Sequence, residues 1–460
     1  MAQPKPRVGR DRTIDGNRAP LALQIGSRGS AMGVRLTDRV ARNYAPQDIT
    51  GLRSPIEIMS RIYPGMFGSG LEPAPVADES VSASDIVDIG IGTYLQTDPA
   101  IAEAVIDGMR SGKLHYLRRP EVNEAVARKY LDEQGVTLEP QTQVFLTGGA
   151  RTAMTLALLR YLEAGDRVIV PDPDYVGLAH LARGLGANVI RTPMVRGEDG
   201  ALSLNLPRLI EQVRSGCRLV MITNPNNPTG LVWSEESLRA LVEAVVEEEA
   251  LLLSNEVYDK LTFDGVRHHS ALACGYPEHT VVVSGPGKAY DMTGLPLGWL
   301  AGSEELLRPL ADVAFMFHIP TPSGPALHAG LAALTEPLRS EHPRKSVEIL
   351  QNNARLTAEV FAGVPGFKFP AVGGGQFAFP WVGVDDVELC VQLKRVAGVT
   401  LMPGSAWGRM GRGHVRVALA NLPEVQVQAL ERLRAGFAQI DLLRDATIAA
   451  PPRGVFEPSR

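Results

Sequence analysis

The sequence predicts an α/β protein whose main sheet is mostly parallel and buried on both faces. Between about residues 139 and 330, short β-branched runs alternate with stretches of helical periodicity. Runs such as DRVIVP and RLVMIT are continuously apolar, which is typical of parallel strands covered by helices on both sides. From about residue 345 the pattern changes to a long helix followed by mixed strands and helices. We therefore expect a large α/β domain and a smaller α+β domain.

The large region is expected to alternate between strands and helices. The predicted strands are, in order, TQVFLT, DRVIVP, ANVIRTP, RLVMIT, ALLLSN, HTVVVSG and LGWLAG. The predicted helices lie near residues 151–163, 175–185, 205–215 and 234–249. The C-terminal region adds the segments GFKFPAVGGGQFAFPWV, GVTLMPGSAWG and HVRVALA among its helices.

The domain limits follow from these patterns. Residues 1–20 and 447–460 lack periodicity and are expected to be tails. Residues 21–88 are expected to form a segment that packs on the small domain or on a partner subunit. The large domain is expected over residues 89–330 and the small domain over residues 331–446.

The composition describes an ordinary globular protein. Of the 460 residues, 45% are hydrophobic and 21% are charged, and the formal net charge is −5. This charge gives no basic excess that would bind nucleic acid or anionic lipid, and no run of about 18 apolar residues could cross a membrane. We therefore expect neither a nucleic-acid partner nor a membrane partner.

The cysteine and histidine patterns argue against a disulfide framework and a metal site. Cys217, Cys274 and Cys390 are far apart and lack CxxC spacing, which favours a reducing compartment. The first residues are basic and polar, without the apolar core of a secretion signal, so a cytoplasmic protein is expected. His268–His269 lie in a polar stretch and are expected to form a solvated loop.

The heptamer NPNNPTG, Asn224–Gly230, follows the predicted strand RLVMIT. Ligands of open α/β sheets bind outside the carboxyl ends of the strands. Prolines hold such a loop extended, and Asn227 offers a neutral amide that can hydrogen-bond a ligand. A rigid Asn/Pro turn without a ligand is the alternative for the shorter fragments NP and NPTG.

Two further strand ends carry residues suited to chemistry. In LTGGARTAMTLAL, the backbone amides of Ala150 and Arg151 lie at the start of a predicted helix, where they can bind an anion; a plain tight turn is the alternative. In HTVVVSGPGKAYDMTG, a turn presents Lys288, one of eight lysines. A sheltered lysine beside an anion site loses its proton more easily and can act as a nucleophilic amine. Lys260 follows ALLLSNEVYD but lacks such a turn, and the other lysines are expected on helical or loop surfaces.

The chain resembles the class I/II aminotransferases, which are pyridoxal-phosphate enzymes of fold type I. The resemblance is carried, in this order along the chain, by the motifs HYLRRPEVNEAVARKY, NPNNPTG, SNEVYDKLTFDG, SGPGKAYDMTGLPLGW, PGSAWG and GHVRVA. It covers about residues 85–440. It implies a seven-stranded, mostly parallel sheet with a smaller C-terminal domain, and a homodimer with active sites at the subunit interface.

The resemblance also implies a role for single residues. Lys288 would form the internal aldimine with the cofactor and then move the Cα proton of the external aldimine of an L-amino acid. Arg416 would bind the substrate's α-carboxylate, a task suited to a planar guanidinium, and Gly92 would contact the substrate. The implied cofactor contacts are Ala150, Arg151 and Ser284 at the phosphate, Asn227 and Tyr258 at the phenolic oxygen, Tyr175 stacked on the ring, and Tyr116 of the other subunit.

Two positions depart from the family pattern. Asn255 stands where the family has an aspartate that pairs with the pyridine nitrogen, and an amide cannot supply that negative charge. Glu256 cannot replace it, because consecutive strand residues point to opposite faces. Pro296 stands where the family has an arginine on the cofactor phosphate. We hypothesise that Arg151 compensates; an arginine at the helix start that faces solvent is the alternative.

The expected activity is transamination of an L-amino acid. Because Asn255 should weaken the electron sink, β- or γ-elimination, replacement, or C–C bond formation, for example on S-adenosylmethionine, remain alternative outcomes at the same site. A catalytically silent binding or regulatory protein of this fold is a further alternative, although residues 1–85 show no helix-turn-helix pattern.

Overall fold

The computed structural model describes residues 86–91, 95–112, 118–440 and 443. The chain divides into residues 1–42 and residues 43–460, and every described residue belongs to the second part. The two predicted tails and nearly all of the predicted N-terminal segment therefore lie outside the described residues.

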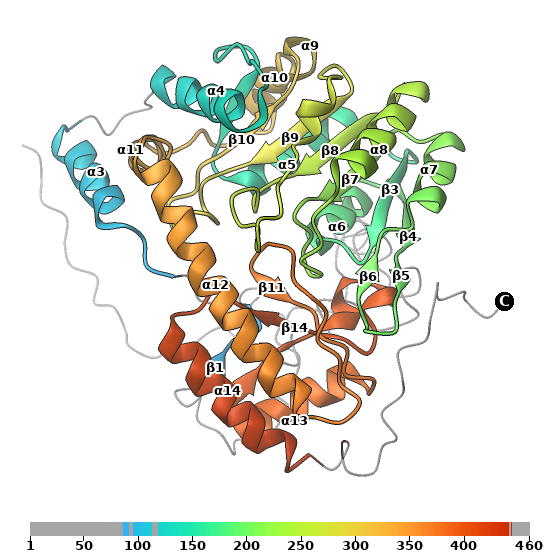
Figure 1. Cartoon of the computed structure of the whole chain (residues 1–460). Coiled ribbons are helices and arrows are strands. Elements are labelled where there is room, and N and C mark those ends of the chain that lie inside the picture. The colour runs from blue at the N-terminus through green and yellow to red at the C-terminus, as the bar shows by residue number, and fades with distance from the viewer. Residues whose placement is uncertain (1–85, 92–94, 113–117, 441–442, 444–460) are drawn as a thin grey trace, which may run out of the picture. The chain divides into compact units, whose positions relative to one another are not determined.

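A seven-stranded sheet forms the centre of the larger region, with the strand order β2-β10-β9-β8-β7-β3-β4 (Figure 1). Strand β10 is antiparallel to both of its neighbours, and the other pairings are parallel. The seven predicted strands are all present, so the predicted α/β class and the mostly parallel sheet are confirmed. The strands are β2 (Val144–Thr147), β3 (Arg167–Asp172), β4 (Asn188–Pro193), β7 (Leu219–Thr223), β8 (Leu251–Asn255), β9 (Thr280–Ser284) and β10 (Gly298–Ala301).

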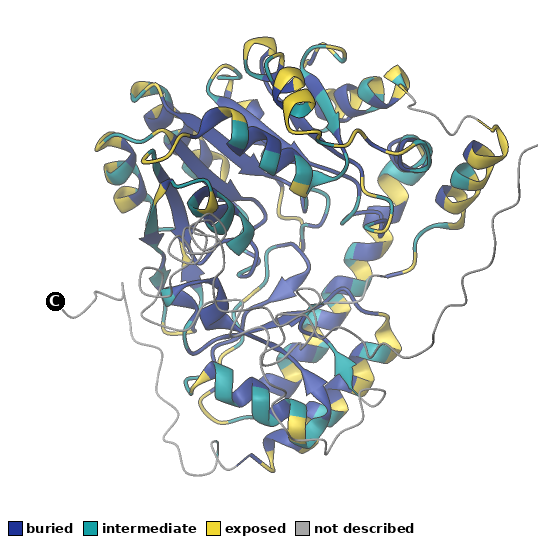
Figure 2. Ribbon diagram, turned by 180° about the vertical axis from the view of Figure 1, so that it is seen from behind, coloured by how far each residue is buried: buried dark blue, intermediate teal, exposed yellow. Residues whose placement is uncertain are grey.

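Helices cover both faces of this sheet, which explains why its strands are continuously apolar. In β7, Val220 and Ile222 pack into one layer, whereas Leu219 and Met221 pack into the other. The first layer contains α4 (Pro120–Gln134), α7 (Leu206–Arg214), α8 (Glu235–Glu247) and the short 3-10 helix η3 (Ala271–Cys274). The second contains α5 (Ala150–Tyr161), α6 (Val176–Gly184), α9 (Glu304–Leu307) and α10 (Leu310–Met316). Figure 2 shows the strands buried and the outer helix surfaces exposed.

The C-terminal region has its own apolar core and two small sheets. Strands β11 (Phe377–Ala378), β14 (Val415–Ala418) and β13 (Met402–Pro403) form one sheet, and β1 (Val87–Asp88) pairs in parallel with β12 (Val399–Thr400). Ile89 is fully buried in this core with residues of the helices α12 and α14. The helices are α12 (Leu338–Ala362), α13 (Asp386–Ala397), α14 (Pro423–Phe437) and the short 3-10 helices η4 (Gly404–Trp407) and η5 (Arg409–Gly411).

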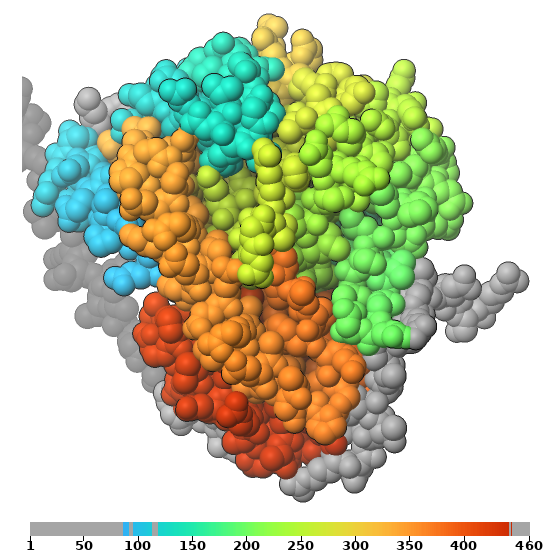
Figure 3. Space-filling view, viewed as in Figure 1, coloured from blue at the N-terminus to red at the C-terminus, as the bar shows by residue number. Residues whose placement is uncertain are grey.

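A hairpin of β5 (Val195–Arg196) and β6 (Leu202–Ser203) joins the two regions (Figure 3). The Arg196 guanidinium donates to the Met410 carbonyl at 2.6 Å and lies 4.8 Å from the centre of the Trp381 ring. On the same side, the His414 ring hydrogen-bonds the Gly200 carbonyl at 3.1 Å. Burial lowers the pKa of His414 to about 3, so a neutral imidazole makes this contact.

Helix α12 begins at Leu338, earlier than the predicted start near residue 345. Pro343 lies inside the helix and has no N–H for the Arg339 carbonyl one turn earlier. That carbonyl instead accepts the Tyr290 hydroxyl at 3.0 Å. A side chain from a distant segment therefore supplies the hydrogen bond that the proline removes from the helix. Sequence periodicity cannot show such a contact. The remaining helices, α3 (Pro99–Arg110) and α11 (Gly324–Ala333), lie against each other.

Candidate active site

The carboxyl ends of three neighbouring strands bring the predicted motifs together. Thr223 at the end of β7 lies opposite Asn255 at the end of β8, and Val283 of β9 lies on the other side of Asn255. Ser284 ends β9, and its hydroxyl donates to the Glu256 carbonyl at 3.0 Å. The NPNNPTG loop and the lysine-bearing turn therefore leave the sheet at the same edge.

Two asparagines of the NPNNPTG loop hold its shape. The Asn224 amide accepts the Trp233 N–H at 3.1 Å and donates to the His269 carbonyl at 3.0 Å. The Asn226 side-chain amide oxygen accepts both the backbone N–H and the hydroxyl of Thr229, at 3.2 Å and 2.7 Å. The third asparagine, Asn227, points away from the loop to other parts of the site.

A cavity of about 420 Å³ lies where α5 begins. Gly149 starts this helix at a φ of 102°, and no side chain caps its first turn. A Cβ on Gly298 would lie only 2.3 Å from the Ala150 nitrogen, so glycine is required for this close approach. The exposed Arg151 lines the cavity together with Lys288 and Pro296. Uncapped helix amides and two cations around one cavity suit a phosphate group.

The turn that carries Lys288 is fixed on several sides. The Lys288 carbonyl accepts from the Gln376 side chain at 3.1 Å. Two residues later, Tyr290 binds the Arg339 carbonyl of α12 and stacks on His342, with ring centres 5.9 Å apart. Asp291 then pairs with the His342 ring at 3.2 Å. These contacts anchor the lysine segment to the long helix of the C-terminal region.

Arg416 and Asn227 form a second group of polar side chains. Arg416 on β14 is buried and donates to the Asn227 amide oxygen at 3.1 Å and to the Gly90 carbonyl at 2.9 Å. Its guanidinium lies against two aromatic rings, 3.8 Å from the centre of Phe377 and 4.3 Å from that of Trp407. The Asn227 amide also donates to the Tyr258 hydroxyl at 3.5 Å.

Asn255 is buried beside two polar residues that the sequence reasoning missed. Its amide nitrogen contacts the Thr223 hydroxyl at 3.5 Å, and its amide oxygen has no hydrogen-bond partner among the described residues. Asp174 accepts the backbone N–H groups of Thr223, at 3.2 Å, and Tyr175. Burial outweighs these bonds and raises the pKa of Asp174 to about 7. The motif PDPDY could have pointed to Asp174, because this residue directly precedes Tyr175, which was predicted to stack on the cofactor ring.

Glu256 points to the opposite side of β8. Its carboxylate accepts the Ser254 hydroxyl and the Ala271 N–H, both at 2.9 Å, and burial raises its pKa to about 7. His268 lies 3.8 Å away and is also buried, which lowers the pKa of the ring to about 4. The expectation that the loop at His268 is solvated is therefore wrong for His268, because the ring is buried beside the Glu256 carboxylate.

The remaining predicted residues have mixed outcomes. Tyr175 is half-buried and its ring lies beside Gly177 at the start of α6. Gly92 and Tyr116 lie outside the described residues. The expectation that the lysines other than Lys288 and Lys260 lie on surfaces is wrong for Lys129, which is buried and bonded to Asp259 at 2.5 Å and Glu133 at 3.1 Å.

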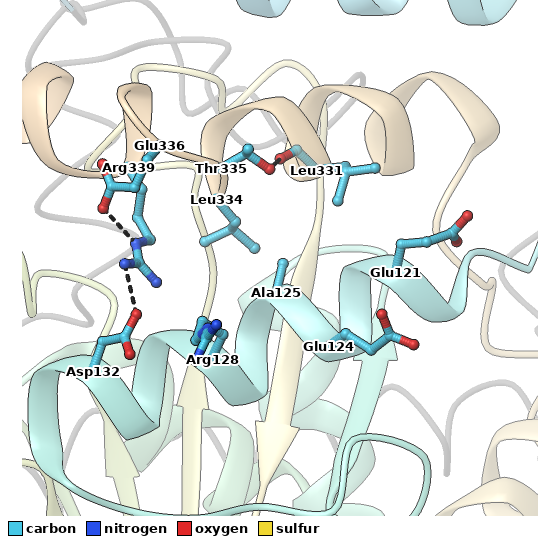
Figure 4. Close-up of a pocket in the computed structure, with 10 residues that line it drawn as sticks. All are labelled: Glu121, Glu124, Ala125, Arg128, Asp132, Leu331, Leu334, Thr335, Glu336 and Arg339. Carbon is cyan, nitrogen blue, oxygen red and sulfur yellow. Dashed lines mark hydrogen bonds and ion pairs between the residues drawn. The ribbon is translucent and has the colours of Figure 1, made fainter.

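A second hollow lies between α4 and the α11–α12 segment (Figure 4). Arg339 crosses it, paired with Glu336 at 2.9 Å and with Asp132 at 2.8 Å. None of the predicted site residues lines it, and it holds no catalytic constellation. Among the described residues, no helix has the length and apolar character to span a membrane. In the same part of the chain, no three His, Cys, Asp or Glu side chains gather as metal ligands.

The fold and this site define an enzyme that binds pyridoxal phosphate. The model of the family "Aminotransferase class I and II" matches residues 84–433. The chain belongs to the class I and II aminotransferase family, whose members use pyridoxal phosphate. The residues present fit this cofactor: a glycine-lined cavity with uncapped amides for the phosphate, a lysine at its wall, and a buried amide oxygen without a partner at Asn255.

Several characterised relatives are similar over most of this chain. An aspartate aminotransferase of Pyrococcus horikoshii is 29% identical over 76% of this chain and 90% of its own length. The aromatic-amino-acid aminotransferase 2 of Thermococcus litoralis is 28% identical, again over 76% and 90%. Among solved structures, the aspartate aminotransferase of Thermus thermophilus with maleate has a TM-score of 0.69 at 29% identity, covering 76% of this chain and 92% of its own.

Proposed function

We propose that this chain is an aminotransferase that converts an L-amino acid to its 2-oxo acid, with Lys288 as the catalytic base. The observation that carries the proposal is that Lys288 shares a cavity with the uncapped amides of α5. Bound pyridoxal phosphate supplies a carbonyl that takes up the amino group and a ring that withdraws electrons from Cα.

Some groups of the site hold the cofactor or the substrate, and Lys288 transfers the proton. The amides of Ala150 and Arg151 bind the phosphate at the positive end of α5. Lys288, tethered on the cavity wall, moves the proton at Cα, a role worth about 10²- to 10⁴-fold in rate. Arg416 holds the α-carboxylate, and its position against Phe377 and Trp407 keeps the guanidinium plane fixed.

Five further residues complete the proposed cofactor site. Asn227 and Tyr258, already in contact with each other, bind the phenolic oxygen. Asn255 would hydrogen-bond the ring nitrogen and Tyr175 would stack on the ring. Ser284, whose hydroxyl donates to the Glu256 carbonyl at 3.0 Å, would lie at the phosphate. We further propose that the working form is a homodimer in which Tyr116 reaches the partner's site and Gly92 contacts substrate.

The relatives guide the choice of substrate. They are named as aspartate and aromatic-amino-acid aminotransferases, so we propose L-aspartate and the aromatic L-amino acids as first amino donors. Arg416 accounts for recognition of the α-carboxylate that all of these donors share.

Incubation of the holoprotein with single amino donors tests the proposal. We expect pyridoxamine phosphate and the matching 2-oxo acid to appear, and an added second 2-oxo acid to restore the aldehyde form. A released or newly joined side chain without pyridoxamine phosphate would instead indicate elimination, replacement or C–C bond formation. No change with any donor, S-adenosylmethionine included, would indicate a catalytically silent protein and contradict the proposal.

A further inference from the structure

Asp291 has a backbone conformation that is unusual for a residue other than glycine. It lies in the turn that carries Lys288, and its φ is 52°. Residues with a side chain meet a steric cost in this left-handed region, although asparagine and aspartate tolerate it better than most. Residues held in such conformations cluster at functional sites, where the surrounding structure fixes them. The neighbours of Asp291 fix it in this way.

The backbone of Asp291 closes the lysine-bearing turn. The Met292 N–H donates to the Gly287 carbonyl at 3.1 Å, across the left-handed residue. A bond of this kind ends many helical turns, usually with glycine at the left-handed position. Lys288 lies inside the turn that the bond closes, and Lys288 and Met292 line the same cavity. The conformation of Asp291 therefore limits where Lys288 can lie.

The side chain of Asp291 is buried against helix α12. Its carboxylate hydrogen-bonds the His342 ring at 3.2 Å and accepts the Ser346 hydroxyl at 3.5 Å. The Asp291 side chain is 1% exposed and the His342 side chain is 8% exposed. A buried carboxylate is costly unless it is paired and hydrogen-bonded. These contacts, and not the intrinsic backbone preference, therefore hold Asp291 in place.

The His342 ring is itself held in place. It stacks on Tyr290, with ring centres 5.9 Å apart and an angle of 20° between the planes. His342 lies on α12, which spans 25 residues, and groups on helices are placed more precisely than groups on loops. The Thr97 hydroxyl also donates to the Asp291 carbonyl. Two separate segments thus fix the end of the lysine-bearing turn.

We propose that Asp291, bonded to His342, is a positioning residue that sets where the Lys288 amine lies during proton transfer at Cα. The inference rests on the proposed function, in which Lys288 is the base. Proton transfer requires the two atoms to lie within hydrogen-bond reach, and a misplacement of about 1 Å can cost about 100-fold in rate. The Asp291–His342 pair therefore acts on the rate of proton transfer and not on the binding of cofactor or donor.

Asp291→Gly separates this role from folding, because glycine is favoured at a φ of 52°. In a single half-reaction followed by absorbance, this holoprotein is expected to convert an amino donor about 10- to 100-fold more slowly than the parent. The rate should depend on deuterium at Cα of the donor, and the donor concentration at half saturation should match that of the parent.

Two further variants test the side-chain contact. His342→Phe, which keeps a ring to stack on Tyr290 but removes the ring nitrogens, should slow the half-reaction to a similar extent. Asp291→Asn keeps a side chain that can hydrogen-bond His342, so it should recover most of the parent rate. Asp264→Gly is the matched control, because Asp264 has a φ of 51° and also contacts α12, through Gln351 at 2.7 Å, but is exposed.

Hydrogen exchange of the apoprotein gives a readout that needs no cofactor. The Met292 amide is expected to exchange faster in Asp291→Gly and in His342→Phe than in the parent, whereas Asp264→Gly should leave it unchanged. Parent-like exchange, a parent-like half-reaction, or a slow half-reaction that is insensitive to deuterium in both variants would overturn the inference while leaving the proposed function intact. A parent that converts no amino donor would contradict the proposed function itself.

Discussion

At the scale of single residues, the site depends on side chains that each contact two partners. Asn227 links the Arg416 guanidinium to the Tyr258 hydroxyl. A change in how the substrate's α-carboxylate binds Arg416 should therefore shift Asn227, which is the residue proposed to bind the phenolic oxygen of the cofactor. Arg151 and Lys288 line the same cavity.

Arg151→Ala is expected to weaken pyridoxal-phosphate binding. Because a hydrogen bond to a charged group contributes about 1.5–3 kcal/mol and Arg151 is exposed, we expect a loss near the low end, about 10-fold in Kd. Titration of the apoprotein measures it. Arg160→Ala, at the other end of the same helix and also exposed, is the control. Equal Kd values for Arg151→Ala and the parent would show that Arg151 does not replace the arginine absent at Pro296.

Arg416→Lys is expected to lower kcat/KM for amino donors by about 10- to 100-fold, since a lysine cannot make the planar two-pronged contact with a carboxylate. Steady-state kinetics with L-aspartate and an aromatic donor measure the effect. Arg355→Lys, on the exposed side of α12, should leave kcat/KM unchanged. Parent-like kinetics in Arg416→Lys would remove Arg416 from the substrate site.

The motifs predicted much of the site at this scale, but not its supporting residues. Lys288, Ala150 and Arg151 lie on one cavity because each follows a strand of the same sheet edge, and strand ends can be recognised in sequence. Thr223 and Asp174 could not be assigned, since 49 positions separate them and only the strand pairing brings them together. The burial of His268 and Lys129 likewise depends on tertiary packing.

At the scale of elements, helix α12 supports the lysine-bearing turn. The Tyr290 hydroxyl occupies the Arg339 carbonyl that Pro343 leaves without a helical donor. The sequence pattern predicted a start near residue 345, later than the observed start at Leu338. The structure shows that a distant tyrosine replaces the missing donor.

Tyr290→Phe is expected to destabilise the protein by about 1 kcal/mol, because it leaves a partly buried carbonyl without a partner. Chemical unfolding of the apoprotein measures the free energy. In a Pro343→Ala background the new N–H can bond the same carbonyl, so the cost of Tyr290→Phe should be smaller there. The same cost in both backgrounds would show that the Tyr290 hydroxyl does not substitute for the helical donor.

At the scale of the whole molecule, folding buries the ionisable groups of Glu256 and His268, and this burial makes the free energy of unfolding depend on pH. Burial raises the pKa of Glu256 from 4.5 to about 7, so the folded state binds a proton that the unfolded state has lost between these values. Stability conferred by this group is therefore present below about pH 4.5 and declines as pH rises toward about 7. The nearby His268, whose pKa is lowered to about 4, acts in the opposite direction.

Glu256→Gln is expected to remove this decline. Relative to the parent, the variant should gain about 2–3 kcal/mol of unfolding free energy between pH 5 and pH 8. Urea unfolding at both pH values measures the difference. Glu243→Gln, on the exposed side of α8, should follow the parent. A parent-like pH dependence in Glu256→Gln would show that Glu256 is ionised in the folded protein throughout this range.

The overall architecture was the most predictable property of the chain. Continuous apolar runs at regular spacing predicted all seven strands of the main sheet, because strands covered on both faces need apolar side chains on both. The hairpin contact between Arg196 and Met410 was not predictable, since it joins segments 214 positions apart.

The central claim is that Lys288 holds pyridoxal phosphate covalently. The most direct measurement is reduction of the holoprotein with borohydride, followed by digestion and mass spectrometry to locate the pyridoxyl group. We predict that it lies on Lys288 alone, and that Lys288→Ala still binds the cofactor but is not labelled. A pyridoxyl group on another of the eight lysines, or bound cofactor that labels none, would contradict the account.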